Sequence, residues 1–323
     1  MPKSSSENRG ALQAAIGTFR PESKGNLASR SRFVGFVGFA ALLAAAFGKP
    51  LVALFVHAAN SNLHSYILLV PFVWGYLFYI RRDQPHAEYG SSPAWAAILL
   101  VIGLAALGIA ESVTTLSHND YLTLMALSFV CSLTAGGFLF LGRKWMSDMA
   151  FPFLFLIFLL PMPDAMANAL ETASKLASTE AANVFFNVTG TPNLRDGTIF
   201  RLPNITIQVA QECSGIRSSW VLLITSLLAA NLFLKSPWRR VALVAAVIPL
   251  GIIRNGFRVW VIGTLCIRFG PAMIHSIIHR RGGPAFFVLS LIPLFLLLWW
   301  LRRGEIARRP ARREVRSQRS EVS

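Results

Sequence analysis

A cysteine is the strongest candidate for chemistry in this chain. Cys213 stands in the run Glu212-Cys213-Ser214-Gly215, between a β-favouring segment and an apolar run. It is expected at the N-terminal end of a helix that Ser214 can cap, where the helix dipole lowers the pKa of a thiol. Arg217, one turn further along, would favour the thiolate as well. The alternative is a small apolar side chain that only packs at a helix end.

Charged residues interrupt a later apolar run. Arg254, Asn255 and Arg258 lie within residues 241–262. A charge at membrane depth costs roughly 3 kcal/mol on insertion scales, so such residues usually face a cavity or a partner. Arg254 and Arg258 are four residues apart and share one helix face. Arg258 is expected near the level of Cys213, the alternative being contact with lipid phosphate, and the sequence suggests no role for Arg254.

Two histidines that are four residues apart, His275 and His279, follow that run. Such a pair can bind zinc, but no Glu lies between them and no third ligand is evident, so neither a metal nor another cofactor is expected. A thiol beside an imidazole is the minimum for covalent acyl transfer. The residues alone therefore indicate a candidate catalytic group of Cys213, Arg258 and one of the two histidines.

The other two cysteines suit structural roles. Cys131 lies in the middle of an apolar run, where a thiol usually packs. Cys266 ends another apolar run but lacks the preceding strand and the adjacent serine. A disulfide between Cys213 and Cys266 is the alternative on an oxidising face. Three scattered cysteines exclude a disulfide framework and a CxxC metal site.

The composition is that of a membrane protein. Of the 323 residues, 54% are hydrophobic and 14% are charged, whereas soluble domains carry about 25% charge. The net charge of +16 comes from Lys and Arg at the chain ends and in short loops, so we expect no nucleic-acid partner. An all-α integral membrane fold in a lipid bilayer follows.

Eight apolar runs are candidates for transmembrane helices, which need about 20 apolar residues each. They span residues 33–56, 64–80, 94–110, 121–141, 149–160, 215–234, 238–265 and 284–301. Lys49-Pro50 predicts a kink in the first run.

Lys and Arg gather in every second connection between these runs, which predicts that both termini are cytoplasmic. Residues 1–32 are expected to form a disordered basic tail and residues 302–323 an Arg-rich tail. The transmembrane domain at 33–301 lies between them.

The longest connection on the opposite side, residues 161–212, carries structure of its own. Asp164 to Val188 has helical periodicity, which predicts an amphipathic helix at the membrane surface. Asp196-Gly197 is a turn signal between β-favouring residues. A helix and a small β-hairpin are therefore expected before the sixth apolar run.

Several of these stretches together resemble the exosortase/archaeosortase family, over roughly residues 60–300. The run from Glu212 to Ser218 is similar to the ECSGxRS signature, and the remaining similar stretches keep the family's order. They are His64-Ser65-Tyr66 with Val70-Pro71, Leu159 to Pro163, Asn255-Gly256-Phe257-Arg258 as NxxR, and His279 with Gly283 as HxxxG.

The resemblance implies a cysteine transpeptidase or protease of the bacterial inner membrane, with its site at the outer face. Such enzymes recognise secreted proteins by a C-terminal sorting signal, which comprises a Pro-Glu-Pro-like motif, a transmembrane helix and a basic tail. They often accompany exopolysaccharide production. By this resemblance Cys213 is the nucleophile, Arg258 stabilises the oxyanion or holds the acidic motif residue, and His279 is the general base. Supporting candidates are Glu212, Ser214, Gly215, Arg217, Asn255 and His275.

Two other functions fit the same sequence. Arg254 and Arg258 would suit the anion pathway of a transporter, although the chain has no internal repeat. A non-catalytic membrane partner in exopolysaccharide assembly is the second alternative.

Overall fold

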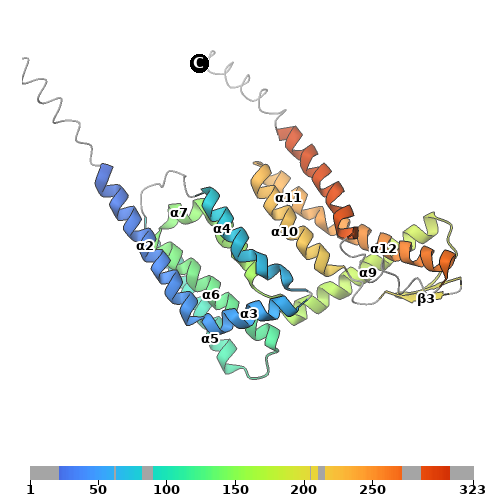
Figure 1. Ribbon diagram of the computed structural model, residues 1–323, viewed down its shortest axis with the longest axis horizontal. Helices are drawn as coiled ribbons and strands as arrows, with labels where there is room; N and C mark the ends of the chain where they lie inside the picture. The colour runs from blue at the N-terminus through green and yellow to red at the C-terminus, as the bar shows by residue number, and fades with distance from the viewer. Residues whose placement is uncertain are drawn as a thin grey trace, which may run out of the picture. The chain divides into compact units, whose positions relative to one another are not determined.

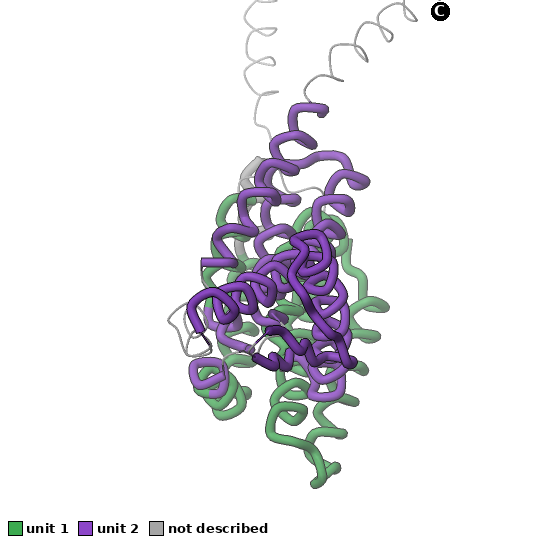
Figure 2. The backbone as a smooth tube through the Cα atoms, turned by 90° about the vertical axis from the view of Figure 1, so that its right-hand side faces the viewer, with its two compact units in different colours: residues 1–56, 69–161 green, residues 57–68, 162–323 purple. Residues whose placement is uncertain are grey.

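Helices make up most of the protein. The computed structural model describes residues 22–61, 63–81, 90–203, 205–209, 215–270 and 285–305. Figure 2 separates the chain into two compact units, residues 1–56 with 69–161 and residues 57–68 with 162–323. Cys213 and both candidate histidines, His275 and His279, lie outside the described residues.

The first unit contains the helices of the N-terminal half, of which Figure 1 labels α2 to α7. Their bounds are α2 Glu22–Ala46, α3 Gly48–Asn60, α4 Val70–Arg81, α5 Pro93–Ser112, α6 His118–Phe140, α7 Arg143–Asp148, α8 Ala150–Phe155 and the 3-10 helix η2 Leu156–Leu159. The last residues of α3 belong to the second unit.

Two predictions for this unit are confirmed. The chain bends by 73° between α2 and α3, immediately before Lys49-Pro50. Cys131 is buried in α6, and a Cβ on Gly103 of α5 would lie 3.3 Å from the Cys131 Cβ. The thiol therefore fills space where α5 and α6 approach closely.

The second unit contains a small sheet and the remaining helices. Their bounds are η1 Ser65–Leu69, whose last residue belongs to the first unit, then α9 Asp164–Val188, β1 Leu194–Asp196, β2 Ile199–Leu202, β3 Ile205–Gln208, α10 Ile216–Phe233, α11 Pro237–Ala245, α12 Val247–Phe269 and a final described helix at Ala285–Glu305.

The sheet confirms the predicted hairpin and extends it. β1 and β2 are antiparallel around Gly197, whose φ of 59° is the left-handed conformation that the turn requires. β3 adds a third antiparallel strand, in the order β1-β2-β3. Arg195 of β1 donates to both carboxylate oxygens of Glu180 in α9, at 2.7 and 2.5 Å. The bidentate pair therefore joins the sheet to α9.

Helices α9 and α12 pack closely because small residues face each other. A Cβ on Gly256 of α12 would lie 2.5 Å from the Ala181 Cβ and 2.9 Å from the Ala182 nitrogen. Further along α12, a Cβ on Gly263 would lie 2.7 Å from the ring of Phe186. These contacts leave no room for larger side chains at either glycine.

All eight apolar runs form helix within the described residues, so the fold is that of an α-helical membrane protein with one small sheet. In the part of the chain that the structure describes, five helices are long and apolar enough to cross a membrane, or up to seven if each bent pair is one span. The helix at Ser65–Arg81 is apolar but shorter. A total of eight spans would need this helix as well.

We expect Gly256→Ala to destabilise the protein by about 1–3 kcal/mol, because the added methyl overlaps α9. Thermal unfolding in detergent measures this as a lower midpoint. Gly108→Ala in α5 is the matched control, since nothing lies within 4 Å of the position of its Cβ. Equal midpoints for the two variants would contradict the close α9–α12 contact.

Candidate active site

The structure describes part of the predicted site. Gly215 directly precedes α10, and Arg217 lies in the first turn of that helix. Asn255 and Arg258 lie in α12. The predicted site residues outside the described ranges are Glu212, Cys213, Ser214, His275 and His279. The described part of the predicted site comprises Gly215, the first turn of α10 and α12.

Helix α10 begins at a glycine that no other residue could replace easily. Its N-cap residue is Gly215, in the left-handed conformation with φ 70°, and not the predicted Ser214. A Cβ on Gly215 would lie 3.0 Å from both Arg254 Nη2 and Asn255 Oδ1. The position therefore needs glycine for its backbone conformation and for the close approach of α12.

Arg254 makes the polar link between α12 and α10. Its Nη2 donates to the Gly215 carbonyl at 3.0 Å and to Ser219 Oγ at 3.1 Å. The serine fits because Gly251 has no side chain, and a Cβ there would lie 2.7 Å from Ser219 Oγ. Sequence reasoning left Arg254 without a role, because neither partner is near it in the chain. The signal available in the sequence was a charged residue within an apolar run.

The other polar residues near this link differ in exposure. Asn255 is buried in α12, and Arg258 is half-buried one turn after Arg254 on the same helix. Arg217, in the first turn of α10, is exposed. Asn255 also lies against Gly215, since a Cβ there would be 3.0 Å from Asn255 Oδ1, whereas the Arg258 side chain is partly exposed.

A buried histidine forms a second polar centre in the same unit. The His64 Nε2 accepts a hydrogen bond from the Met162 N–H at 3.3 Å. Since a backbone N–H can only donate, the neutral ring carries its proton on Nδ1. The Nδ1 lies 3.2 Å from Ser61 Oγ and 3.3 Å from His57 Nε2, and either atom can accept that proton.

Aromatic and apolar contacts join this histidine to the start of α10. The Tyr66 ring lies 6.1 Å from the Trp220 ring, centroid to centroid. Met162, Ala167 and Ile216 form a small buried core against which Trp220 packs. Three stretches that are far apart in sequence thus meet: residues 63–66, the segment around Met162, and α10.

This cluster was not among the predicted site residues. His64 and Tyr66, like Met162, entered the sequence argument only as parts of similar motifs. All three residues belong to stretches that are similar to motifs of one family. That shared similarity was the signal that could have suggested their contact.

Cys266, the rival thiol, is a free cysteine and only 1% exposed in α12. Its position suits packing and leaves it out of reach of a substrate. No three His, Cys, Asp or Glu side chains in the described ranges lie close enough to hold a metal ion.

The comparison with protein families gives one match. The model described as transmembrane exosortase matches residues 58–296. The comparisons with curated proteins and with solved structures give no match.

We expect His64→Ala to destabilise the protein by about 1–3 kcal/mol, because the buried Met162 N–H loses its acceptor. A lower midpoint of thermal unfolding in detergent measures this. The exposed His118→Ala is the matched control and should leave the midpoint unchanged. Equal midpoints for His64→Ala and His118→Ala would contradict the buried hydrogen bond.

Proposed function

The chain belongs to the transmembrane exosortase family, and on that premise we propose that it is a membrane-embedded cysteine transpeptidase or protease. Its substrate is a secreted protein with a C-terminal sorting signal of the Pro-Glu-Pro type. Cys213 is the nucleophile, Arg258 the oxyanion donor and His279 the general base. His275 is the alternative base.

One observation carries the proposal, the hydrogen bond from Arg254 to the Gly215 carbonyl. Gly215 follows Cys213 by two residues, and two residues extend the chain by at most about 7 Å. The helix that bears Asn255 and Arg258 therefore lies next to Gly215, the last residue of the ECSG stretch. This supports a joint role for the ECSG and NxxR stretches.

In the first half-reaction the Cys213 thiol gives its proton to His279, and the thiolate attacks a backbone carbonyl of the sorting signal. Arg258 stabilises the negative oxygen of the tetrahedral intermediate, and a donor of this kind contributes roughly 3 kcal/mol. The C–N bond then breaks, His279 returns the proton to the leaving amine, and a thioester remains on Cys213.

In the second half-reaction a nucleophile attacks the thioester carbonyl and loses its proton to His279. The C–S bond breaks, and the proton returns to the Cys213 sulfur. An amine nucleophile gives a new amide and makes the enzyme a transpeptidase, whereas water gives a carboxylic acid and makes it a protease.

The proposed setting is the bacterial inner membrane, with eight spans in a domain at residues 33–301 and both termini in the cytoplasm. The site then lies at the outer face, beside exopolysaccharide assembly. A transporter has less support, because the chain belongs to the transmembrane exosortase family and has no internal repeat.

We expect Cys213→Ala to abolish processing of a co-expressed membrane protein that bears a Pro-Glu-Pro-type signal, because the proposed thioester forms on the Cys213 sulfur. Immunoblotting of substrate size measures this. Cys266→Ala is the matched control and should process normally, since that thiol is buried. Processing that persists in Cys213→Ala would refute the mechanism and favour the transporter or the assembly partner.

A further inference from the structure

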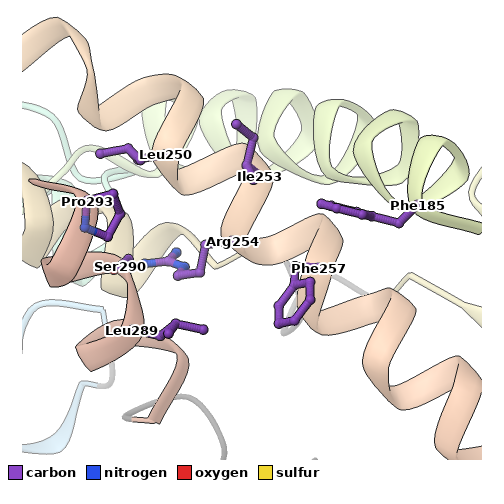
Figure 3. A pocket seen from close by; sticks show the side chains of 8 residues that line it. All are labelled: Phe185, Leu250, Ile253, Arg254, Phe257, Leu289, Ser290 and Pro293. Atoms are coloured by element: carbon purple, nitrogen blue, oxygen red, sulfur yellow. The ribbon is translucent and has the colours of Figure 1, made fainter. Parts of the chain in front are cut away.

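Three helices of the second unit meet at one end. α10, α11 and the helix at Ala285–Glu305 share one buried apolar core. Farther from this end, Leu289 and Pro293 of the last helix line a pocket together with α12 (Figure 3). All three helices belong to segments that are long and apolar enough to cross a membrane, α11 being continuous with α12. Their common end comprises residues 233–240 and 299–305, and we call it the juxtamembrane cluster.

Hydrogen bonds hold the parts of the juxtamembrane cluster together. The Glu305 carboxylate accepts from the Ser236 N–H at 2.7 Å and from the Lys235 N–H at 3.1 Å, just before α11 begins. In return, Arg239 Nη1 of α11 donates to the Leu301 carbonyl at 2.6 Å. These bonds fix the ends of three apolar helices at one level. The level is the one at which the chain leaves the hydrocarbon and reaches the lipid headgroups.

Positive charge dominates this cluster. Its cations are Lys235, Arg239, Arg240, Arg302 and Arg303, and its carboxylate is that of Glu305. The chain that follows, residues 306–323, carries six arginines and two glutamates, so it adds further positive charge. A surface with this excess of cations attracts an anion.

Two of the arginines are held by aromatic rings. The Arg302 Cζ lies 5.6 Å from the centre of the Phe233 ring in α10, and the Arg303 Cζ lies 5.3 Å from the centre of the Trp299 ring. Both arginines are exposed. Stacking occupies the face of a guanidinium and leaves the N–H groups at its edge free to donate. Such ordered forks match the oxygens of a phosphate group.

Exposed tryptophans lie among these cations. Trp238 is 74%, Trp299 58% and Trp300 65% exposed. An indole ring with this exposure suits the boundary of a bilayer, where its apolar body contacts acyl chains and its N–H reaches the headgroups. A ligand at this cluster therefore meets apolar and cationic surface together. A phospholipid has both parts, whereas a free phosphate ion would use only the cations.

We propose that the juxtamembrane cluster binds the headgroup of an anionic phospholipid. Arg302 and Arg303 donate to the phosphate, Lys235 adds positive charge, and Trp238 contacts the adjoining acyl carbons. A zwitterionic headgroup binds less well, because its own ammonium group already balances the phosphate. The inference is independent of the proposed chemistry, since it involves neither Cys213 nor a protein substrate. With both termini in the cytoplasm, the lipid belongs to the inner leaflet.

The test titrates the purified full-length protein, in a nonionic detergent, with phosphatidylglycerol or with phosphatidylcholine. Native mass spectrometry measures the lipid that remains bound. We expect phosphatidylglycerol to bind on the order of tenfold more tightly than phosphatidylcholine. The double variant Arg302→Gln with Arg303→Gln should lose most of this preference, because it removes the two stacked phosphate donors.

A matched control removes the same charge elsewhere. Arg143 and Lys144 are also exposed and adjacent, but the tryptophan beside them, Trp145, is buried. Arg143→Gln with Lys144→Gln should therefore leave the preference intact.

A second variant keeps the test valid if the change at Arg302 and Arg303 prevents folding. Lys235→Gln with Trp238→Ala alters two exposed side chains. It leaves the bond to Glu305 in place, because that bond uses the backbone N–H of Lys235. We expect this variant to bind phosphatidylglycerol severalfold more weakly than the unaltered chain.

Equal binding of the two lipids by the unaltered chain would overturn the proposal, as would a preference that persists in both variants of the juxtamembrane cluster. An equal loss of preference in the Arg143 and Lys144 control would show general attraction to charge and would overturn it too. Displacement of phosphatidylglycerol by an equal concentration of inorganic phosphate would identify a phosphate site that needs no lipid, which also contradicts the proposal. Loss of preference confined to variants of the cluster would support it.

Discussion

The bonds from Arg254 to Gly215 and Ser219 are the contact on which the candidate site depends. They join α12 to the first turn of α10, and they form only because Gly215 and Gly251 have no side chains in the way. A buried guanidinium is costly in an apolar run, so its partners must be placed accurately. Gly215 adopts a left-handed backbone conformation in this arrangement, which other residue types rarely adopt.

Local sequence patterns predicted most of the helices and the turn between β1 and β2. Apolar run length is a property of consecutive residues, and so is the 3.6-residue period that predicted α9 with its bounds at Asp164 and Val188. The Asp-Gly turn is equally local, because a positive φ at Gly197 is a requirement of the turn itself. Run length was a weaker guide to membrane spans, since the short helix at Ser65–Arg81 falls below the length of a span.

The contacts that build the site could not be read from such patterns. His64 and Met162 are 98 residues apart, and Arg254 and Gly215 are 39 apart. No periodicity relates residues at these separations, because their contact depends on how whole helices pack. The start of α10 shows the same limit on a smaller scale. Ser214 is the better capping residue by type, yet the N-cap falls on Gly215, where the approach of Arg254 and Asn255 excludes any Cβ.

The close seam between α9 and α12 affects how sequence motifs in this family are interpreted. Gly256 stands inside the Asn255-Gly256-Phe257-Arg258 stretch because Ala181 and Ala182 leave no space for a side chain. Asn255 is likewise fixed by its contact with Gly215. These two motif positions are thus explained by helix packing, whatever reaction the protein performs. A paralogue that had lost its nucleophile would keep them for the sake of the fold. Under the proposed mechanism, active enzymes and pseudoenzymes would therefore differ at Cys213 and His279.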